Sequence, residues 1–270
     1  MSKGPGSNGP GTRGLRGLPA GKILGMLDAT ATGLLAAAFF AAAVLYASVG
    51  HAGASGYLAA MAFIGAPTPM MRPTALVLNL LVASIATIRF SRAGFFSWRL
   101  FWPFAAGAIP LAYLGGGIVL PGHWYRTLVG LVLWASAVRL WLNLRVSATT
   151  HAPPIVVALL CGTGIGFLEG LTGTGGGIFL SPLLLFMGWA ETRETGGVAA
   201  AFILVNSAAG LAGNPASLGA LPAQLPLWAG AAVGGGLIGA ELGSRRIGTP
   251  MFRRLLGVVL IVAGAKLIFS

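Results

Sequence analysis

Charge is what this chain has least of. Only 8% of its 270 residues are charged, with 17 Lys and Arg against 5 Asp and Glu, whereas 56% are hydrophobic. A soluble domain carries about 25% charged residues. So few charges cannot cover a surface exposed to water, which excludes a soluble globular protein. We therefore expect an all-α polytopic membrane protein, with room for about eight to ten helical crossings of roughly 20 apolar residues each.

Groups that could catalyse a reaction or bind a metal are equally scarce. The single cysteine, Cys161, excludes an intramolecular disulfide and a dithiol redox motif. Five acids and three histidines show no metal-ligand spacing, and no nucleotide-binding loop is present. We therefore expect neither an enzyme nor an ATP-driven pump, with no catalytic residue, no bound metal and no cofactor. The net charge of +12 lies in the N-terminal segment and in short loops, which is typical of membrane orientation and not of nucleic-acid binding.

The apolar runs form two series, each interrupted by a glycine-rich break. Residues 1–28 are rich in Gly, Pro and basic side chains and are expected to be a disordered tail. Two membrane repeats are expected to span 29–147 and 148–270. The predicted runs are 31–49, 57–66, 73–90, 100–120, 126–144, 154–169, 177–189, 195–213, 226–243 and 251–269. The run after each break is short, so it is expected to be a half-helix or a tilted crossing.

The two series match each other along the chain. Gly50 and Gly53 recur 120 positions later as Gly170 and Gly173, and matches further along each half lie 127 positions apart. Loop residues between matched elements tolerate insertions, which explains the change in spacing. The sequence therefore predicts a duplicated unit with a glycine-rich break in each copy.

Charge indicates that the two copies are inverted. The loop 89–99 contains three arginines, whereas the equivalent loop 213–226 contains no charged residue. Because basic loops stay in the cytoplasm, equivalent loops are expected on opposite sides of the membrane. This predicts two inverted repeats of about five helical segments each, ten crossings in all, with both termini outside. Eight helices plus two re-entrant segments is the open alternative.

The breaks are predicted to form an anion site. A helix that begins in mid-membrane presents unpaired N–H groups and a positive dipole end, and glycine lets a ligand approach closely. Alternatives are helix capping by Ser and Thr, a histidine bonded to a nearby carbonyl, packing glycines and asparagines that join helices. The residues predicted to bind the substrate are Gly50, His51, Gly53, Ser55, Gly56, Asn79, Thr172, Gly173, Thr174, Gly175, Gly176, Gly177 and Asn206.

Charged residues near the breaks have predicted roles of their own. Glu169 ends a long apolar run just before the second break and is the candidate for proton coupling, with a water-facing position at the interface as the alternative. Arg72 and Arg193 occupy equivalent positions and are predicted to steer an anion into the pathway or to bind headgroups. Glu241 is expected to pair with Arg245, four residues later.

The paired breaks resemble those of the sulfite exporter TauE/SafE family, also called the toluene sulfonate uptake permeases. The resemblance lies in GlyHisAlaGlyAlaSerGly at 50–56, GlyLeuThrGlyThrGlyGlyGly at 170–177, Pro182 and the segment through Asn206. It covers nearly everything after the basic tail. It implies inverted repeats, transport of sulfite, sulfonates or related sulfur oxyanions across the inner membrane, and coupling to the proton gradient.

Together these features predict a secondary transporter that moves a small anion by alternating access around 50–56 and 170–177. The expected location is the cytoplasmic (inner) membrane, which the chain crosses several times. The expected partners are a small anionic substrate, the lipid bilayer and a coupling proton, with no nucleic acid and with a homodimer left open. The alternatives are an inverted-repeat carrier of a carboxylate or another small metabolite, an anion channel, and a passive membrane scaffold.

Overall fold

The computed structural model describes residues 29–141, 151–245, 261 and 264–269. The predicted basic tail (1–28), the predicted boundary near residue 147 and most of the last apolar run lie outside the described residues. Within the described ranges every regular element is a helix, as the composition predicts. The elements are α2 (Ala29–Ala47), α3 (Ala54–Phe63), α4 (Thr68–Arg92), α5 (Trp98–Gly117), α6 (Gly122–Trp141), α7 (Ile155–Thr172), α8 (Gly177–Phe186), α9 (Thr192–Ala212), the 3-10 helix η1 (Pro215–Ala220) and α10 (Leu225–Arg245).

Six of the described helices, α2, α4, α5, α7, α9 and α10, are long and apolar enough to cross a membrane by length and composition. The helices after the two breaks, α3 and α8, have 10 residues each. At 1.5 Å per residue they are about 15 Å long, half of the hydrocarbon core. Both are followed by a glycine in the left-handed region, Gly65 (φ 72°) and Gly188 (φ 65°), which turns the chain into the next long helix.

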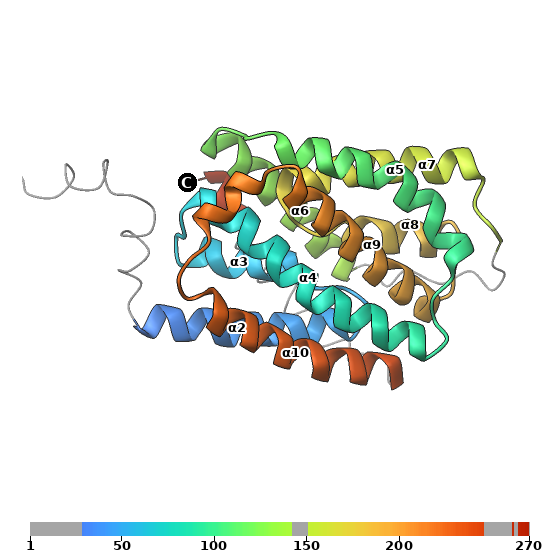
Figure 1. Ribbon diagram of the computed structural model, residues 1–270, viewed down its shortest axis with the longest axis horizontal. Coiled ribbons are helices and arrows are strands. Elements are labelled where there is room, and N and C mark those ends of the chain that lie inside the picture. The colour runs from blue at the N-terminus through green and yellow to red at the C-terminus, as the bar shows by residue number, and fades with distance from the viewer. Residues whose placement is uncertain (1–28, 142–150, 246–260, 262–263, 270) are drawn as a thin grey trace, which may run out of the picture.

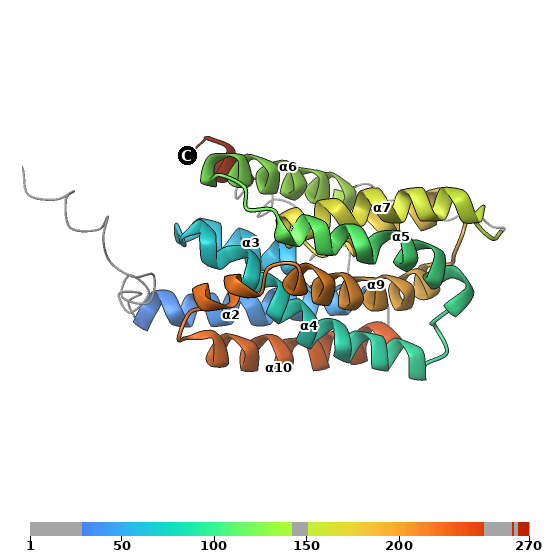
Figure 2. The ribbon, with the colours of Figure 1, turned by 45° about the horizontal axis from the view of Figure 1, so that its top comes forward.

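Equivalent helices run in opposite directions (Figure 1). In that view α2, α4 and α10 run from left to right, whereas α7, α9 and α5 run from right to left. The matched pairs are α2 with α7, α4 with α9 and α5 with α10, so each helix is antiparallel to its counterpart. The turned view in Figure 2 shows the same directions.

The halves are interleaved and do not form two separate bodies. The first helix of each half packs along the fourth helix of the other, α2 on α10 and α7 on α5, and α4 packs on α9 at the centre. Figures 1 and 2 show the α2–α10 and α5–α7 pairs on opposite sides of the central pair. Any separation of the halves must therefore shift these interhelical contacts.

Glycine ridges explain why the outer pairs approach so closely. Gly162, Gly166 and Gly170 on α7 lie four positions apart and face backbone carbonyls of α5, and a Cβ atom at any of them would overlap those carbonyls. Gly235 and Gly239 on α10 face backbone carbonyls of α2 in the same way, and Gly243 faces that of Ser48, the residue after α2. Small residues at this spacing are the usual contact between helices in membranes. Gly170 is therefore a packing glycine inside a helix, and the second break begins later than the sequence predicts.

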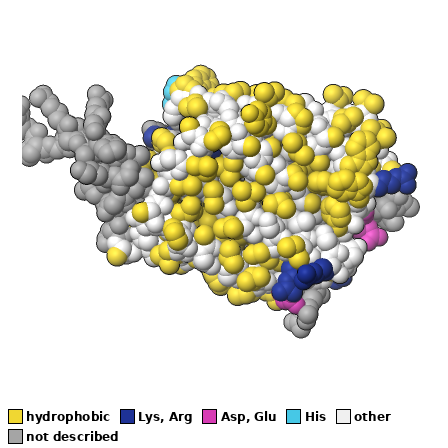
Figure 3. All heavy atoms as spheres, in the orientation of Figure 1, with side chains coloured by type: hydrophobic (Ala, Val, Ile, Leu, Met, Phe, Trp, Pro, Cys, Tyr) yellow, Lys and Arg dark blue, Asp and Glu magenta, His cyan; other side chains and the backbone are white. Residues whose placement is uncertain are grey.

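Figure 3 shows an apolar belt between charged ends. The middle of the visible face carries hydrophobic side chains, and charged side chains lie toward the ends of the molecule. The right-hand end in Figure 1, where α4 ends and α9 begins, holds Arg89, Arg92 and Arg193. This distribution is the one that a bilayer imposes on a spanning protein.

Candidate functional site

The two breaks meet at one cavity in the middle of the helix bundle. Its walls come from the first break, from the second break and from α4 and α9, and it has room for about one water molecule. The lining residues are Tyr46, His51, Ala52, Gly53, Ala54, Ser55, Asn79, Thr174, Gly175, Ile178 and Ile203. Segments about 120 positions apart in the sequence thus face each other, and six predicted binding residues lie among them.

Both half-helices begin at this cavity without a side-chain cap. The N-cap of α3 is Gly53 (φ 107°) and that of α8 is Gly176, so neither N-cap residue supplies a capping side chain, and the Glu169 carboxyl lies beside the backbone of Gly176. The capping alternative is therefore wrong for these two N-termini. In α8 the N–H groups of Ile178 and Phe179 donate to Gly175 O and Gly176 O at 3.3 and 3.0 Å, whereas in α3 the bond to the N-cap comes from Tyr57 N–H to Gly53 O at 3.0 Å. Each start still directs a positive dipole end toward the region of the cavity.

The hydroxyl groups near the breaks bond elsewhere. Ser55 Oγ, in the first turn of α3, donates to Tyr46 Oη at 2.6 Å. Thr172 Oγ1 donates to Leu168 O at 2.7 Å and lies 2.8 Å from Thr174 Oγ1. These bonds fix the side chains that border the cavity. Tyr46, which the sequence analysis missed, is buried and belongs to the site through its bond to Ser55.

His51 joins the two halves. Its Nε2 lies 2.8 Å from Gly177 O and 3.0 Å from Ser181 Oγ, and its Nδ1 lies 3.1 Å from Val49 O. The alternative of a histidine bonded to a nearby carbonyl is therefore correct for Nδ1. The contacts of Nε2 are with α8, so they connect the first break to the half-helix of the other repeat.

A buried polar cluster lies beside the cavity. Glu169 is fully buried in α7, one turn before the helix ends at Thr172, so the predicted helix end was too early and the interfacial alternative is wrong. Ser207 Oγ donates to Glu169 Oε1 at 3.4 Å, and Asn79 Nδ2 donates to Ser207 Oγ at 3.4 Å. Asn79 also lines the cavity. The sequence analysis missed Ser207 because only the crossing of α4, α7 and α9 brings these three side chains together.

Several predicted residues shape the breaks without lining the cavity. Gly50 has φ 78° and lies against the backbone of Gly196, where a Cβ would overlap. A Cβ on Gly56 would lie 2.8 Å from Ala42 Cβ, and one on Gly177 would lie 2.6 Å from Ile203 Cδ1. Four other residues predicted to bind the substrate also do not line the cavity: Thr172, Gly173, Gly176 and Asn206.

Asn206 and Gly176 surround the Glu169 carboxyl. Asn206 is fully buried on α9, and its amide lies beside that carboxyl without a hydrogen bond of good geometry. A Cβ on Gly176 would lie 2.6 Å from Glu169 Oε2. Glycine at 176 therefore leaves the space that this carboxyl oxygen occupies.

The two arginines at equivalent positions have different surroundings. Arg72 is buried at the start of α4, where its guanidinium donates to Ile118 O at 3.0 Å and to Gly116 O, at the C-terminal end of α5. Arg193 is exposed, and its guanidinium lies 5.1 Å from the centre of the Phe95 ring. Neither lines the cavity. Arg72 therefore holds the end of α5 and also borders Gly173 of the second break.

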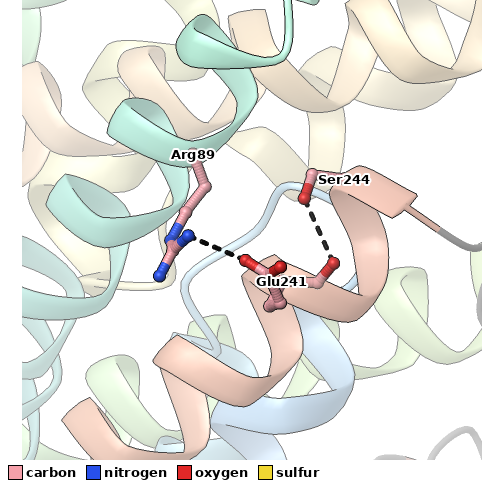
Figure 4. Close-up of polar contacts among 3 residues, drawn as sticks. All are labelled: Arg89, Glu241 and Ser244. Carbon is pink, nitrogen blue, oxygen red and sulfur yellow. Dashed lines mark hydrogen bonds and ion pairs between the residues drawn. The ribbon is translucent and has the colours of Figure 1, made fainter.

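Glu241 forms an ion pair with Arg89, a residue of another helix. Its Oε2 lies 2.8 Å from Arg89 Nη1, so the pair joins α10 to α4 (Figure 4). Ser244 Oγ donates to the backbone oxygen of Glu241 at 3.1 Å. The predicted partner, the side chain of Arg245, lies outside the described residues. Among the described residues, no group of three His, Cys, Asp or Glu side chains could hold a metal ion.

Comparison with known proteins agrees with this architecture. The family model described as "Sulfite exporter TauE/SafE" matches residues 34–267. The chain belongs to the TauE/SafE family. A Sinorhizobium fredii protein named "Probable membrane transporter protein y4hK" is 45% identical over 248 residues, which cover 90% of this chain and 100% of the relative. No solved structure matches. The family and the six apolar helices make this chain a multi-pass membrane transport protein and point away from an enzyme.

Proposed function

We propose that this TauE/SafE protein is a secondary transporter that carries a small sulfur oxyanion, such as sulfite or a sulfonate, across the cytoplasmic membrane. The family description supports the substrate class. The single observation that carries the proposal is the pair of uncapped helix starts, one from each half, at the wall of one cavity. Backbone N–H groups at a helix start bind oxyanions well, so no metal and no buried cation is needed to hold the substrate.

Alternating access is the proposed mechanism. The cavity has room for about one water molecule, which is less than a sulfite ion needs. Substrate entry therefore requires the first and second breaks to separate. The opposite directions of equivalent helices and the exchanged pairs α2–α10 and α5–α7 support two inverted repeats, which rock against each other around a site near the midplane. The residues predicted to bind the substrate either line this cavity or shape the breaks beside it.

Glu169 is the proposed site of the coupling proton. It is fully buried, and the groups around its carboxyl, the Ser207 hydroxyl, the Asn206 amide and the Gly176 backbone, are all neutral. The ion pair seen among the described residues joins Arg89 to Glu241 and does not include Glu169. An ionised carboxylate in such a place is costly, and a carboxyl inside a membrane bundle is a typical proton-transfer group.

The proposed orientation places the end with Arg89, Arg92 and Arg193 in the cytoplasm, because basic residues favour that side. The N-terminus of α2 then lies at the outer side. Arg72 and Arg193 lie toward opposite ends of the pathway and are proposed to attract the anion there.

Flux in proteoliposomes tests the transport function. Purified protein is reconstituted, and uptake of radiolabelled sulfite and methanesulfonate is compared with uptake of sulfate, acetate and succinate. We expect uptake of a sulfur oxyanion that is accelerated by the same anion on the far side, since an exchange of this kind requires a carrier. Uptake without counterflow would indicate a channel. Uptake of carboxylates alone would contradict the proposed substrate class.

A further inference from the structure

Three fully buried side chains form a continuous hydrogen-bond chain that leads from the cavity into α7. Asn79 of α4 lines the cavity and donates from Nδ2 to Ser207 Oγ of α9, and Ser207 donates to Glu169 Oε1. Both bonds are 3.4 Å long, beyond the usual range of about 2.7–3.2 Å for strong bonds. Bonds this loose cost little to rearrange.

The cluster also contains an unusual concentration of buried polar atoms without hydrogen-bond partners. They are Asn79 Oδ1, Glu169 Oε2 and both polar side-chain atoms of Asn206. Most buried polar atoms in proteins have a partner, and each one that lacks it costs about 1–3 kcal/mol. A carboxyl oxygen is an acceptor while the group is ionised and becomes a donor once it is protonated. A proton between Glu169 and Ser207 would therefore free the Ser207 hydroxyl to donate to Asn79 Oδ1, one of these unpaired atoms.

We infer that Asn79 is an anion-binding switch at one end of a hydrogen-bond chain whose direction is set by a proton on Glu169. With Glu169 ionised, the carboxylate accepts from Ser207 Oγ–H, so Ser207 accepts from the Asn79 NH₂ group. One of the two Asn79 N–H groups is then committed to Ser207, and the carbonyl oxygen of Asn79 is left without a partner. An acceptor repels an anion, so the Asn79 wall of the cavity disfavours the substrate in this state.

Protonation reverses every bond in the chain. The neutral carboxyl donates its proton to a hydrogen bond with Ser207 Oγ, and Ser207 then donates to Asn79 Oδ1. This requires the Asn79 side-chain amide to flip by about 180°, which exchanges the positions of its oxygen and nitrogen within nearly the same volume. Both N–H groups are then available to donate to an anion in the cavity, and the carbonyl oxygen is paired with Ser207. No covalent bond changes apart from the one proton that Glu169 gains.

Other titratable groups lie around the same centre and must be separated from Glu169. His51 and Tyr46 line the cavity from the first half, and Tyr57 donates to Ala52 O behind it. Arg72 of α4 borders the second break, and Tyr125 of α6 donates to Thr172 O. None of these groups belongs to the Asn79–Ser207–Glu169 chain. The switch therefore predicts that substitution of His51 leaves the proton linkage in place.

The inference rests on the proposed function, since it explains why one anion and one proton bind together. If a proton on Glu169 raises the affinity for an anion, the bound anion must raise the affinity for that proton by the same factor. Anion binding is therefore accompanied by proton uptake. The Glu169→Gln variant keeps a neutral donor beside Ser207, so it imitates the protonated state without titrating.

Calorimetry of the purified full chain tests the switch. Methanesulfonate is the probe because its charge is constant between about pH 5 and pH 9, unlike that of sulfite. Titration in buffers of different ionisation enthalpy measures the protons taken up per anion bound. In the wild type we expect uptake that approaches about one proton per anion, with weaker binding as the pH rises. In Glu169→Gln we expect binding that is independent of pH and free of proton uptake.

Further variants separate the chain from its surroundings. Ser207→Ala breaks the chain, so we expect it to bind the anion without linked proton uptake. Ser181→Ala keeps the chain and should retain the proton uptake per anion bound. Should Glu169→Gln fail to fold, Ser207→Ala and Asn79→Leu supply the same comparison. Binding without proton uptake in the wild type, or uptake that persists in Glu169→Gln or Ser207→Ala, would overturn the switch. Failure of methanesulfonate and thiosulfate to bind the wild type would instead count against the proposed function.

Discussion

His51 Nε2 lies 2.8 Å from the carbonyl oxygen of Gly177, a residue 126 positions later in the chain. The contact joins the break of the first half to the first turn of the half-helix in the second half. Any motion that separates the two breaks must break or replace this bond. His51 is thus a structural link as well as a wall of the cavity.

Replacement of His51 by alanine should lower both stability and anion affinity. Gly177 O and Ser181 Oγ would lose their partner in a buried place, at a cost of about 1–3 kcal/mol. The midpoint of thermal unfolding in detergent and the affinity for methanesulfonate measure the two effects. Ser181→Ala, which leaves the bond to Gly177 intact, is the matched control and should lower the midpoint less. Equal effects of the two substitutions would argue against a cross-link through His51.

Alanine at Gly50 should be far more damaging than alanine at Gly164. Gly50 has φ 78° and touches the backbone of Gly196, whereas a Cβ on Gly164 meets nothing within 4 Å. Gly164 lies inside α7, where alanine favours the helix by about 0.5–1 kcal/mol. We expect Gly164→Ala to keep or raise the unfolding midpoint and Gly50→Ala to prevent folding or lower it strongly. Yield of monodisperse protein and the melting curve decide between these results.

Arg72 and Arg193 should respond differently to replacement by alanine. Arg72 holds backbone carbonyls at the end of α5 from a buried position, so its loss leaves buried acceptors without a donor. Arg193 is exposed over Phe95, where a cation–π contact contributes about 0.5–1 kcal/mol. Arg72→Ala should therefore cost clearly more stability than Arg193→Ala. If Arg193 attracts the anion, its variant should raise the KM for uptake at low salt, and an unchanged KM would exclude that role.

The Arg89–Glu241 ion pair should contribute little to stability. Its side chains are 43% and 33% exposed, and pairs of this kind contribute about 0.2–1 kcal/mol. A double-mutant cycle of Arg89→Gln and Glu241→Gln, followed by thermal unfolding at low and high salt, measures the coupling. We expect a small coupling that weakens as salt is added. A coupling of several kcal/mol would mean that the pair is shielded from water by a partner or by lipid.

The breaks and the helix order could be predicted because their signals are local. Glycine and proline interrupt apolar runs at positions that the sequence displays directly, and α3 and α8 follow them as short helices. One local signal misled the prediction. Gly170 was interpreted as a break, but it is a packing glycine, since a Cβ there would overlap Ala112 O of α5. The helix therefore continues past Glu169 to Thr172.

The interior of the site could not be predicted because it depends on helix crossings. Ser207 is an ordinary serine in an apolar helix until α4 and α7 bring Asn79 and Glu169 beside it. The ion pair of Glu241 with Arg89 joins α10 to α4, and no pattern within either helix indicates it. Local periodicity carries no information on such contacts, since they depend on which helices become neighbours.

Thermal stabilisation of the purified protein by anions tests the central claim most directly. A ligand that binds only the folded state raises the unfolding midpoint by mass action. We predict stabilisation of the wild type by sulfur oxyanions from a panel of sulfite, thiosulfate, sulfonates and sulfate, and little by small carboxylates. The effect should be lost in Gly176→Ala, whose Cβ would lie 2.6 Å from Glu169 Oε2, and kept in Gly164→Ala. Stabilisation by carboxylates alone, or by no anion at all, would contradict a sulfur oxyanion site at the paired breaks.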